Sequence, residues 1–152
     1  MLIHRKGISV KELIVDGSSS GRVVVGELTT WDSTLSKEVK TAMVVLYGFT
    51  GMSTTSIPPA AVARFNKMVG KVVSELDEKY EGRIICMGDF NSLSEVDSDG
   101  MGLVNGVVSE ESLVSIVLEQ GLIDWFRVLH PSMKAVSFGG NQGSYSLSLI
   151  HI

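Results

Sequence analysis

Residues 58–91 read PPAAVARFNKMVGKVVSELDEKYEGRIICMGDFN. Within Val62–Leu76, apolar residues recur every three or four positions and charged residues fill the opposite face, which predicts an amphipathic helix. The two prolines suit a helix start, because the N–H group that proline lacks has no helical partner there. Glu81-Gly82 interrupts the pattern, and the apolar run Arg83–Met87 that follows predicts a strand.

A second apolar run, Ala42–Tyr47, precedes this helix and ends at Gly48. Its nearly continuous apolar character predicts a strand that is buried on both faces. A strand, a helix and a strand in this order favour a βαβ crossover, in which the two strands run parallel. The fold class expected from these segments is α/β or α+β with substantial sheet.

The flanking segments predict further elements. Two apolar-rich stretches within Ile8–Glu27 enclose the turn formers Asp16–Gly21, a pattern typical of a β-hairpin. A shorter helix is expected over about Glu110–Gln120, where apolar residues again fall on one face. Two final strands, Lys134–Phe138 and Tyr145–Ile152, are expected on either side of a glycine-containing turn.

Composition limits the classes of function. The 152 residues suit one domain, expected over residues 1–152, and 44% of them are hydrophobic. The 13 Lys and Arg against 17 Asp and Glu give a net charge of −4, which argues against a broad basic surface for nucleic acid. The single cysteine, Cys86, excludes an intramolecular disulfide and a multi-cysteine zinc site, and its place in an apolar run indicates inert packing.

The sequence shows no signal peptide, and no run approaches the roughly 20 apolar residues that span a bilayer. A soluble, intracellular protein without a membrane partner is therefore expected, with nucleus or cytoplasm and the oligomeric state left open. The chain stops at Ile152 within the apolar run SLSLIHI, which suggests a fragment.

The sharpest chemical signal is Gly88-Asp89-Phe90-Asn91, directly after the strand Arg83–Met87. Hydrolysis of a phosphodiester needs a carboxylate that orients or deprotonates the attacking water. It also needs a neutral donor, such as an Asn amide, that approaches a phosphate oxygen without charge repulsion. Asp and Asn also cap ordinary strand-end turns, so these residues alone leave both interpretations open.

This motif and its position resemble those of the endonuclease/exonuclease/phosphatase superfamily, and of its non-LTR retrotransposon endonucleases in particular. Three further segments resemble segments of the family and occur in the same order along the chain. Four matches in the right order arise by chance much less often than one. They are Val44–Gly48, then Leu122–Arg127 followed by His130-Pro131, and finally Ser137-Phe138 with Ser146–Ile150. The resemblance covers the chain from about Ile8 to its C-terminus.

The resemblance implies a DNase I-like fold, a layered β-sandwich flanked by helices, here incomplete at its N- and C-terminal ends. It implies that Asp89 orients the attacking water, that Asn91 contacts the scissile phosphate and that Tyr47 faces this phosphate. Ser137 would bind substrate, and Asp97 would be a metal ligand. The implied cofactor is Mg²⁺ or Mn²⁺, and the implied partner is DNA.

The chain also departs from the family pattern. The Gln-Glu pair whose Glu binds magnesium is not found, since Glu12 and Glu27 lie in strand-like stretches whose contexts do not match it. Ser148 stands where the family has an Asp, and the family's final Ser-Asp-His would fall beyond Ile152. Losing one positioned acid–base group costs roughly 10²–10⁴-fold in rate. The expectation is therefore a phosphodiester hydrolase domain, a fragment or degenerate copy, with little activity alone.

Two other hypotheses remain open. The chain could be a non-catalytic binding or scaffold domain that keeps the fold and binds a partner in the cleft that serves as the active site in the family. It could also be an unrelated α/β domain in which Gly88–Asn91 is only a turn. That last hypothesis predicts that Tyr47, Asp89 and Asn91 do not converge in space.

Overall fold

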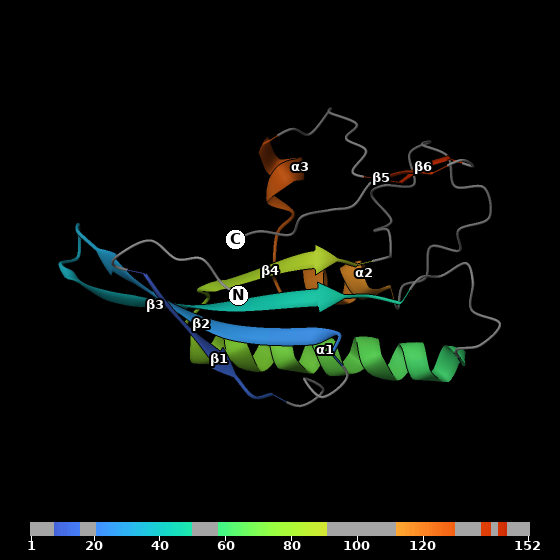
Figure 1. The fold of residues 1–152 in the computed structure, drawn as a ribbon, viewed down its shortest axis with the longest axis horizontal. Helices are drawn as coiled ribbons and strands as arrows, with labels where there is room; N and C mark the ends of the chain where they lie inside the picture. The colour runs from blue at the N-terminus through green and yellow to red at the C-terminus, as the bar shows by residue number, and fades with distance from the viewer. Residues whose placement is uncertain are drawn as a thin grey trace.

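The computed structural model describes residues 8–15, 21–49, 58–90, 112–129, 138–140 and 143–145. Within these residues the chain has a mixed α+β fold with a four-stranded sheet, a short separate hairpin and three helices (Figure 1). The strands are β1 (Ser9–Leu13), β2 (Val23–Asp32), β3 (Lys37–Tyr47), β4 (Ile84–Asp89), β5 (Phe138–Gly140) and β6 (Gly143–Tyr145). The helices are α1 (Pro59–Lys79), α2 (Leu113–Glu119) and α3 (Trp125–Leu129).

The larger sheet has the strand order β1-β2-β3-β4. Strands β1, β2 and β3 are antiparallel neighbours, so the hairpin predicted within residues 8–27 is confirmed. Strand β4 lies parallel to β3, and α1 connects the two strands in sequence. The predicted βαβ crossover is therefore confirmed as well.

Strand β3 begins at Lys37, earlier than the expected start at Ala42. The residues before Ala42 are mostly polar and show no apolar run, but each of them pairs with a residue of β2. The turn between β2 and β3 is closed by Asp32, whose Oδ1 accepts hydrogen bonds from the backbone N–H groups of Thr34 at 2.8 Å and Leu35 at 3.0 Å. Cross-strand pairing, rather than hydrophobic periodicity, extends this hairpin.

The expectation that β3 is buried on both faces is wrong. Ala42, Val44 and Leu46 are at most 2% exposed, whereas Val45 and Tyr47 on the other face are 40% and 49% exposed. The reason is that the hydrophobic core joins only one face of the sheet to α1 and α2. Its members from the sheet and helices include Val23, Val25, Val44, Leu46, Val69, Val73, Ile84, Cys86, Val114 and Val117.

Helix α1 follows the predicted helix closely, with Pro58 at its N-cap and the next proline as its first residue. It ends where Glu81 and Gly82 adopt φ values of +54° and +80°. The N–H of Gly82 donates to the carbonyl oxygen of Asp77 at 3.0 Å, so a backbone group at the helix end is satisfied. The local sequence thus sets both ends of this helix.

Helix α2 lies within the segment expected to be helical, and its first described turn is capped by Ser112, whose Oγ accepts from the N–H of Ser115 at 3.1 Å. It packs against α1 at Gly70, where an added Cβ would lie 2.8 Å from Cγ2 of Ile116. The absence of a side chain at Gly70 therefore permits the close approach of the two helices.

The C-terminal elements agree with the sequence in part. Strands β5 and β6 pair with Phe138 opposite Tyr145, and both residues belong to the two expected final strands. The other residues of those two expected strands lie outside the described residues. Helix α3 has no counterpart among the expected elements, because five residues are too few for a helical period to be recognised.

Candidate functional site

Tyr47 and Asp89 lie opposite each other at the carboxyl ends of the parallel strands β3 and β4. The N–H of Gly48 donates to the carbonyl oxygen of Asp89 at 2.7 Å, so the two chains remain joined just beyond this pair. The Tyr47 side chain is 49% exposed and Asp89 is partly buried. In an open α/β sheet, ligands bind beyond the carboxyl ends of such strands.

The sequence singled out three further site residues. Asn91, Asp97 and Ser137 lie outside the described residues. The structure therefore brings together two of the candidate site residues, Tyr47 and Asp89.

Two glycines explain how the strand ends approach so closely. A Cβ on Gly88 would overlap the carbonyl oxygen of Leu46, and a Cβ on Gly48 would overlap the carbonyl oxygen of Phe90. Gly88 also has φ of +137°, a conformation that L side chains rarely adopt. Each glycine adjoins a candidate site residue, so the glycine of the Gly-Asp-Phe-Asn motif has a steric role in forming the site.

Arg22 is a residue of this site that the sequence did not reveal. It precedes β2, and its Nη1 donates to the carbonyl oxygens of Tyr47 and Gly48, both at 3.2 Å. Its guanidinium carbon lies 4.1 Å from the ring centroid of Phe49 and 5.1 Å from that of Tyr47. An arginine before an apolar strand carries no local signal of this kind, because the contacts exist only once β2 pairs with β3.

The described part of the site combines a carboxylate, a phenol and a guanidinium at one end of the sheet. A carboxylate can orient or deprotonate water, and a phenol or a guanidinium can donate hydrogen bonds to anionic oxygens. Among the described residues, however, no group of three His, Cys, Asp or Glu side chains could hold a metal ion. The described residues alone therefore do not form the magnesium site that the family resemblance implies.

Glu27, the acidic residue of β2, lies away from this site. It pairs with Ala42, five residues before Tyr47, which corresponds to about 16 Å along a strand at about 3.3 Å per residue. Its Oε1 lies 2.9 Å from Nζ of Lys40, and its Oε2 accepts a hydrogen bond from the Tyr80 hydroxyl at 2.8 Å. Glu27 thus ties the end of α1 to the sheet.

These contacts shift two pKa values. The hydrogen bond with Lys40, and then that with Tyr80, lowers the pKa of Glu27 below its ordinary value of 4.5. Burial, together with the neighbouring Glu27 carboxylate, raises the pKa of Tyr80 from 10.0 to about 12. Both shifts favour the pair formed by a charged carboxylate and a neutral phenol.

We expect Tyr80→Phe to destabilise the protein in a pH-dependent way. A lowered carboxyl pKa contributes stability that is present above pH 4.5 and is lost as the pH falls through the folded-state value. The free energy of unfolding should therefore be lower for the variant at pH 7, and this difference should shrink below pH 4.5. A raised phenol pKa contributes stability that is present below pH 10 and is lost as the pH rises to about 12, so the difference should shrink there too.

Urea unfolding at several pH values measures this difference. Tyr47→Phe is the matched control. It also removes one phenol hydroxyl, but the Tyr47 side chain is exposed, so this substitution should change stability little. A difference between Tyr80→Phe and wild type that stays constant from pH 3 to pH 12 would contradict the assignment.

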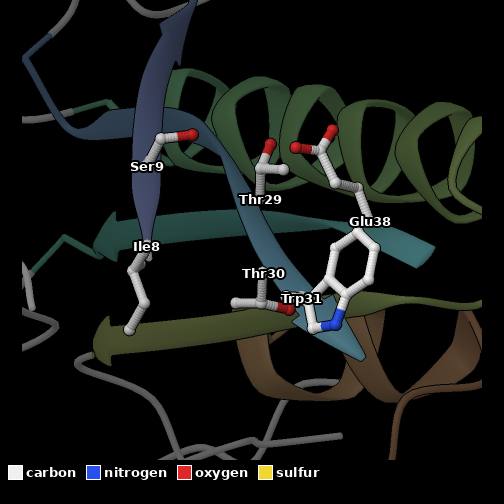
Figure 2. A pocket seen from close by; sticks show the side chains of 6 residues that line it. All are labelled: Ile8, Ser9, Thr29, Thr30, Trp31 and Glu38. Atoms are coloured by element: carbon white, nitrogen blue, oxygen red, sulfur yellow. The ribbon is translucent and has the colours of Figure 1, made fainter. Parts of the chain in front are cut away.

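A pocket of about 380 Å³ lies at the other end of the sheet, on the β1–β2–β3 side (Figure 2). It is lined by Ile8, Ser9, Thr29, Thr30, Trp31 and Glu38. Trp31 and Glu38 are paired residues of β2 and β3 near the hairpin turn, remote from the strand ends that carry Tyr47 and Asp89. The pocket is therefore separate from the candidate site.

The thiol of Cys86 is buried in the core, and burial raises its pKa to about 12. The prediction that Cys86 is a packing residue is confirmed by this burial.

No protein family model matches the chain, and comparison with curated proteins finds no match either. In the part of the chain that the structure describes, none of the helices has both the length and the apolar character needed to cross a membrane.

Proposed function

We propose that this chain is part of a metal-dependent phosphodiester hydrolase domain of the endonuclease/exonuclease/phosphatase type, with DNA as its substrate class. The observation that carries the proposal is the pairing of Tyr47 with Asp89 at the carboxyl ends of β3 and β4. These residues come from two segments, Val44–Gly48 and Gly88–Asn91, that resemble the family independently in sequence. Their pairing places both candidate residues at the edge of the sheet where ligands bind in open α/β folds.

The proposal includes a DNase I-like sandwich in which a second sheet covers the free face of the first. The apolar side chains of Val24 and Val45 support it, because they are 47% and 40% exposed on adjacent strands. Exposed apolar residues in the middle of a sheet are typical of a face that packs against another element. The opposite face is already occupied by the core with α1 and α2.

In the proposed reaction, the Asp89 carboxylate orients the attacking water and accepts its proton. The Tyr47 hydroxyl and the Asn91 amide donate hydrogen bonds to phosphate oxygens, and Ser137 binds substrate. Magnesium would neutralise charge on the phosphate in such enzymes. Asp97 is proposed as one of its ligands. The sequence lacks the family's Gln-Glu pair and has Ser148 in place of an Asp, so the chain alone is expected to have little activity.

Nicking of supercoiled DNA with Mg²⁺ or Mn²⁺ tests the proposal. We expect slow, metal-dependent nicking that Asp89→Asn reduces at least about 100-fold, because the variant retains the shape of the side chain but loses its basicity. Asp77→Asn, on α1, is the matched control and should nick DNA as the wild type does. Absence of metal-dependent nicking by the wild type, or equal nicking by Asp89→Asn, would contradict the proposal.

A second candidate function is a non-catalytic binding domain that keeps this fold. It is favoured by the sequence itself, which lacks the family's Gln-Glu pair and has Ser148 where the family has an Asp. The same preparations distinguish the two functions in a DNA-binding measurement. Binding without nicking, unchanged in Asp89→Ala, would support the binding domain.

A further inference from the structure

Arg22 makes two side-chain hydrogen bonds to the backbone at the end of β3. A single nitrogen, Nη1, donates to two consecutive carbonyl oxygens, those of Tyr47 and Gly48, at 3.2 Å each. The main chain of Arg22 also takes part, because its carbonyl oxygen accepts from the N–H of Tyr47 at 2.8 Å. Arg22 therefore holds the end of β3 through both its backbone and its side chain.

The peptide group between Tyr47 and Gly48 links Arg22 to Asp89. Its carbonyl oxygen accepts from Arg22, and its N–H donates to the carbonyl oxygen of Asp89 at 2.7 Å. The peptide group is planar, so two hydrogen bonds on opposite sides fix its orientation. Hydrogen bonds in such a chain also polarise and strengthen one another. A chain of hydrogen bonds thus runs from the guanidinium of Arg22 to the backbone carbonyl of Asp89.

Arg22 also fixes the aromatic rings beside the site. Its guanidinium lies over the rings of Phe49 and Tyr47, at 4.1 Å and 5.1 Å from their centroids. Phe49 in turn meets Phe65 of α1 edge to face, with ring centroids 5.1 Å apart and an interplanar angle of 77°. A planar guanidinium can stack on rings while it donates hydrogen bonds, and a lysine ammonium lacks this plane.

We propose that Arg22 is a positioning residue for this site, which holds the Tyr47 ring and, through the Tyr47–Gly48 peptide, the backbone of Asp89. The inference rests on the proposed function for its consequence in catalysis. Its structural part can be measured independently of any activity. Misplacement of reacting groups by about 1 Å can cost about 100-fold in rate, so loss of Arg22 should lower kcat rather than raise KM.

Arg22→Met and Arg22→Lys test the inference, with Arg83→Met as the matched control. Arg83 also donates to a backbone carbonyl, that of Lys40 at 3.1 Å, but it is exposed and lies at the amino end of β4. Amide hydrogen exchange of Gly48 and the NMR shifts of the Tyr47 and Phe49 rings report on positioning. Nicking kinetics with Mg²⁺ on a supercoiled plasmid report on function.

In Arg22→Met we expect Gly48 to exchange about 10-fold faster, since a hydrogen-bonded neighbour of its peptide group is lost. Both ring resonances should shift, and kcat should fall about 10-fold to 100-fold with little change in KM. Arg22→Lys keeps the charge but should restore neither the exchange protection nor kcat. Arg83→Met should resemble the wild type in every measurement.

The outcomes separate the two proposals. If the wild type shows no metal-dependent nicking, the proposed function fails, while the exchange and ring shifts still decide whether Arg22 positions Tyr47 and Gly48. If those signals are the same in Arg22→Met and Arg83→Met, the positioning role is overturned. Full recovery of kcat in Arg22→Lys, or a loss expressed only in KM, would overturn it as well, because Arg22 would then act through its charge on the substrate.

Discussion

Gly88→Ala is expected to abolish the stable fold. A Cβ at this position would overlap the carbonyl oxygen of Leu46 and lie 2.8 Å from the Leu46 nitrogen. These are backbone atoms of the paired strand, so no flexible side chain can move aside. The φ of +137° adds a conformational cost of about 1–3 kcal/mol for a residue with a side chain. Together these effects should exceed about 4 kcal/mol, a large fraction of the stability of a small domain.

Gly82→Ala is the control for the conformational part of this effect. Gly82 also has a positive φ, +80°, but an added Cβ would meet no atom within 4 Å. Its substitution should cost about 1–2 kcal/mol, from the left-handed conformation alone. Circular dichroism and urea unfolding compare the two variants. Equal free energies of unfolding would show that the steric contact at Leu46 is relieved at little cost.

Phe90→Ala is expected to destabilise the protein by about 3–5 kcal/mol, because it removes a large aromatic side chain from a packed core. Phe90 is 1% exposed and is the largest of the fully buried side chains among the described residues. It follows Asp89 directly, so its burial also holds the end of β4 in place. In the Gly-Asp-Phe-Asn motif, the phenylalanine therefore contributes to packing rather than to chemistry.

Urea unfolding of Phe90→Ala and Phe90→Leu measures this contribution. The leucine variant retains much of the apolar volume and should lose clearly less stability than the alanine variant. Trp31→Ala is the contrasting control, since Trp31 is 61% exposed and its loss should change stability by about 0.5 kcal/mol or less. A loss below about 1 kcal/mol in Phe90→Ala would contradict the core role of this side chain.

Local patterns in the sequence were sufficient for the βαβ unit. The helical period of residues 62–76 predicted α1, and the two prolines and Glu81-Gly82 predicted its ends, because caps and breakers act over a few residues. The apolar run Arg83–Met87 predicted β4 and, with it, the strand-end position of Asp89. The pairing of β1 with β2 was likewise predictable from the strand and turn residues of the hairpin.

Features that depend on contacts between distant residues were not predictable. The early start of β3 comes from pairing of polar residues with β2, which leaves no hydrophobic period. The bond between Tyr80 and Glu27 joins residues 53 positions apart, and Arg22 reaches Tyr47 across 25 positions. The local sequence around Arg22, Glu27 and Tyr80 gives no sign of these contacts.

Sequence alone therefore located the carboxyl ends of the two parallel strands, since hydrophobic periodicity and turn residues act locally. Strand β3 ends at Tyr47 as predicted, and β4 continues beyond the predicted Met87 to Asp89. Tertiary structure alone decided that Tyr47 lies opposite Asp89, that Gly88 must lack a side chain and that Arg22 joins them. The physical reason is register: hydrogen bonds between strands bring together residues that are far apart in sequence, and their spacing along the chain does not encode that pairing.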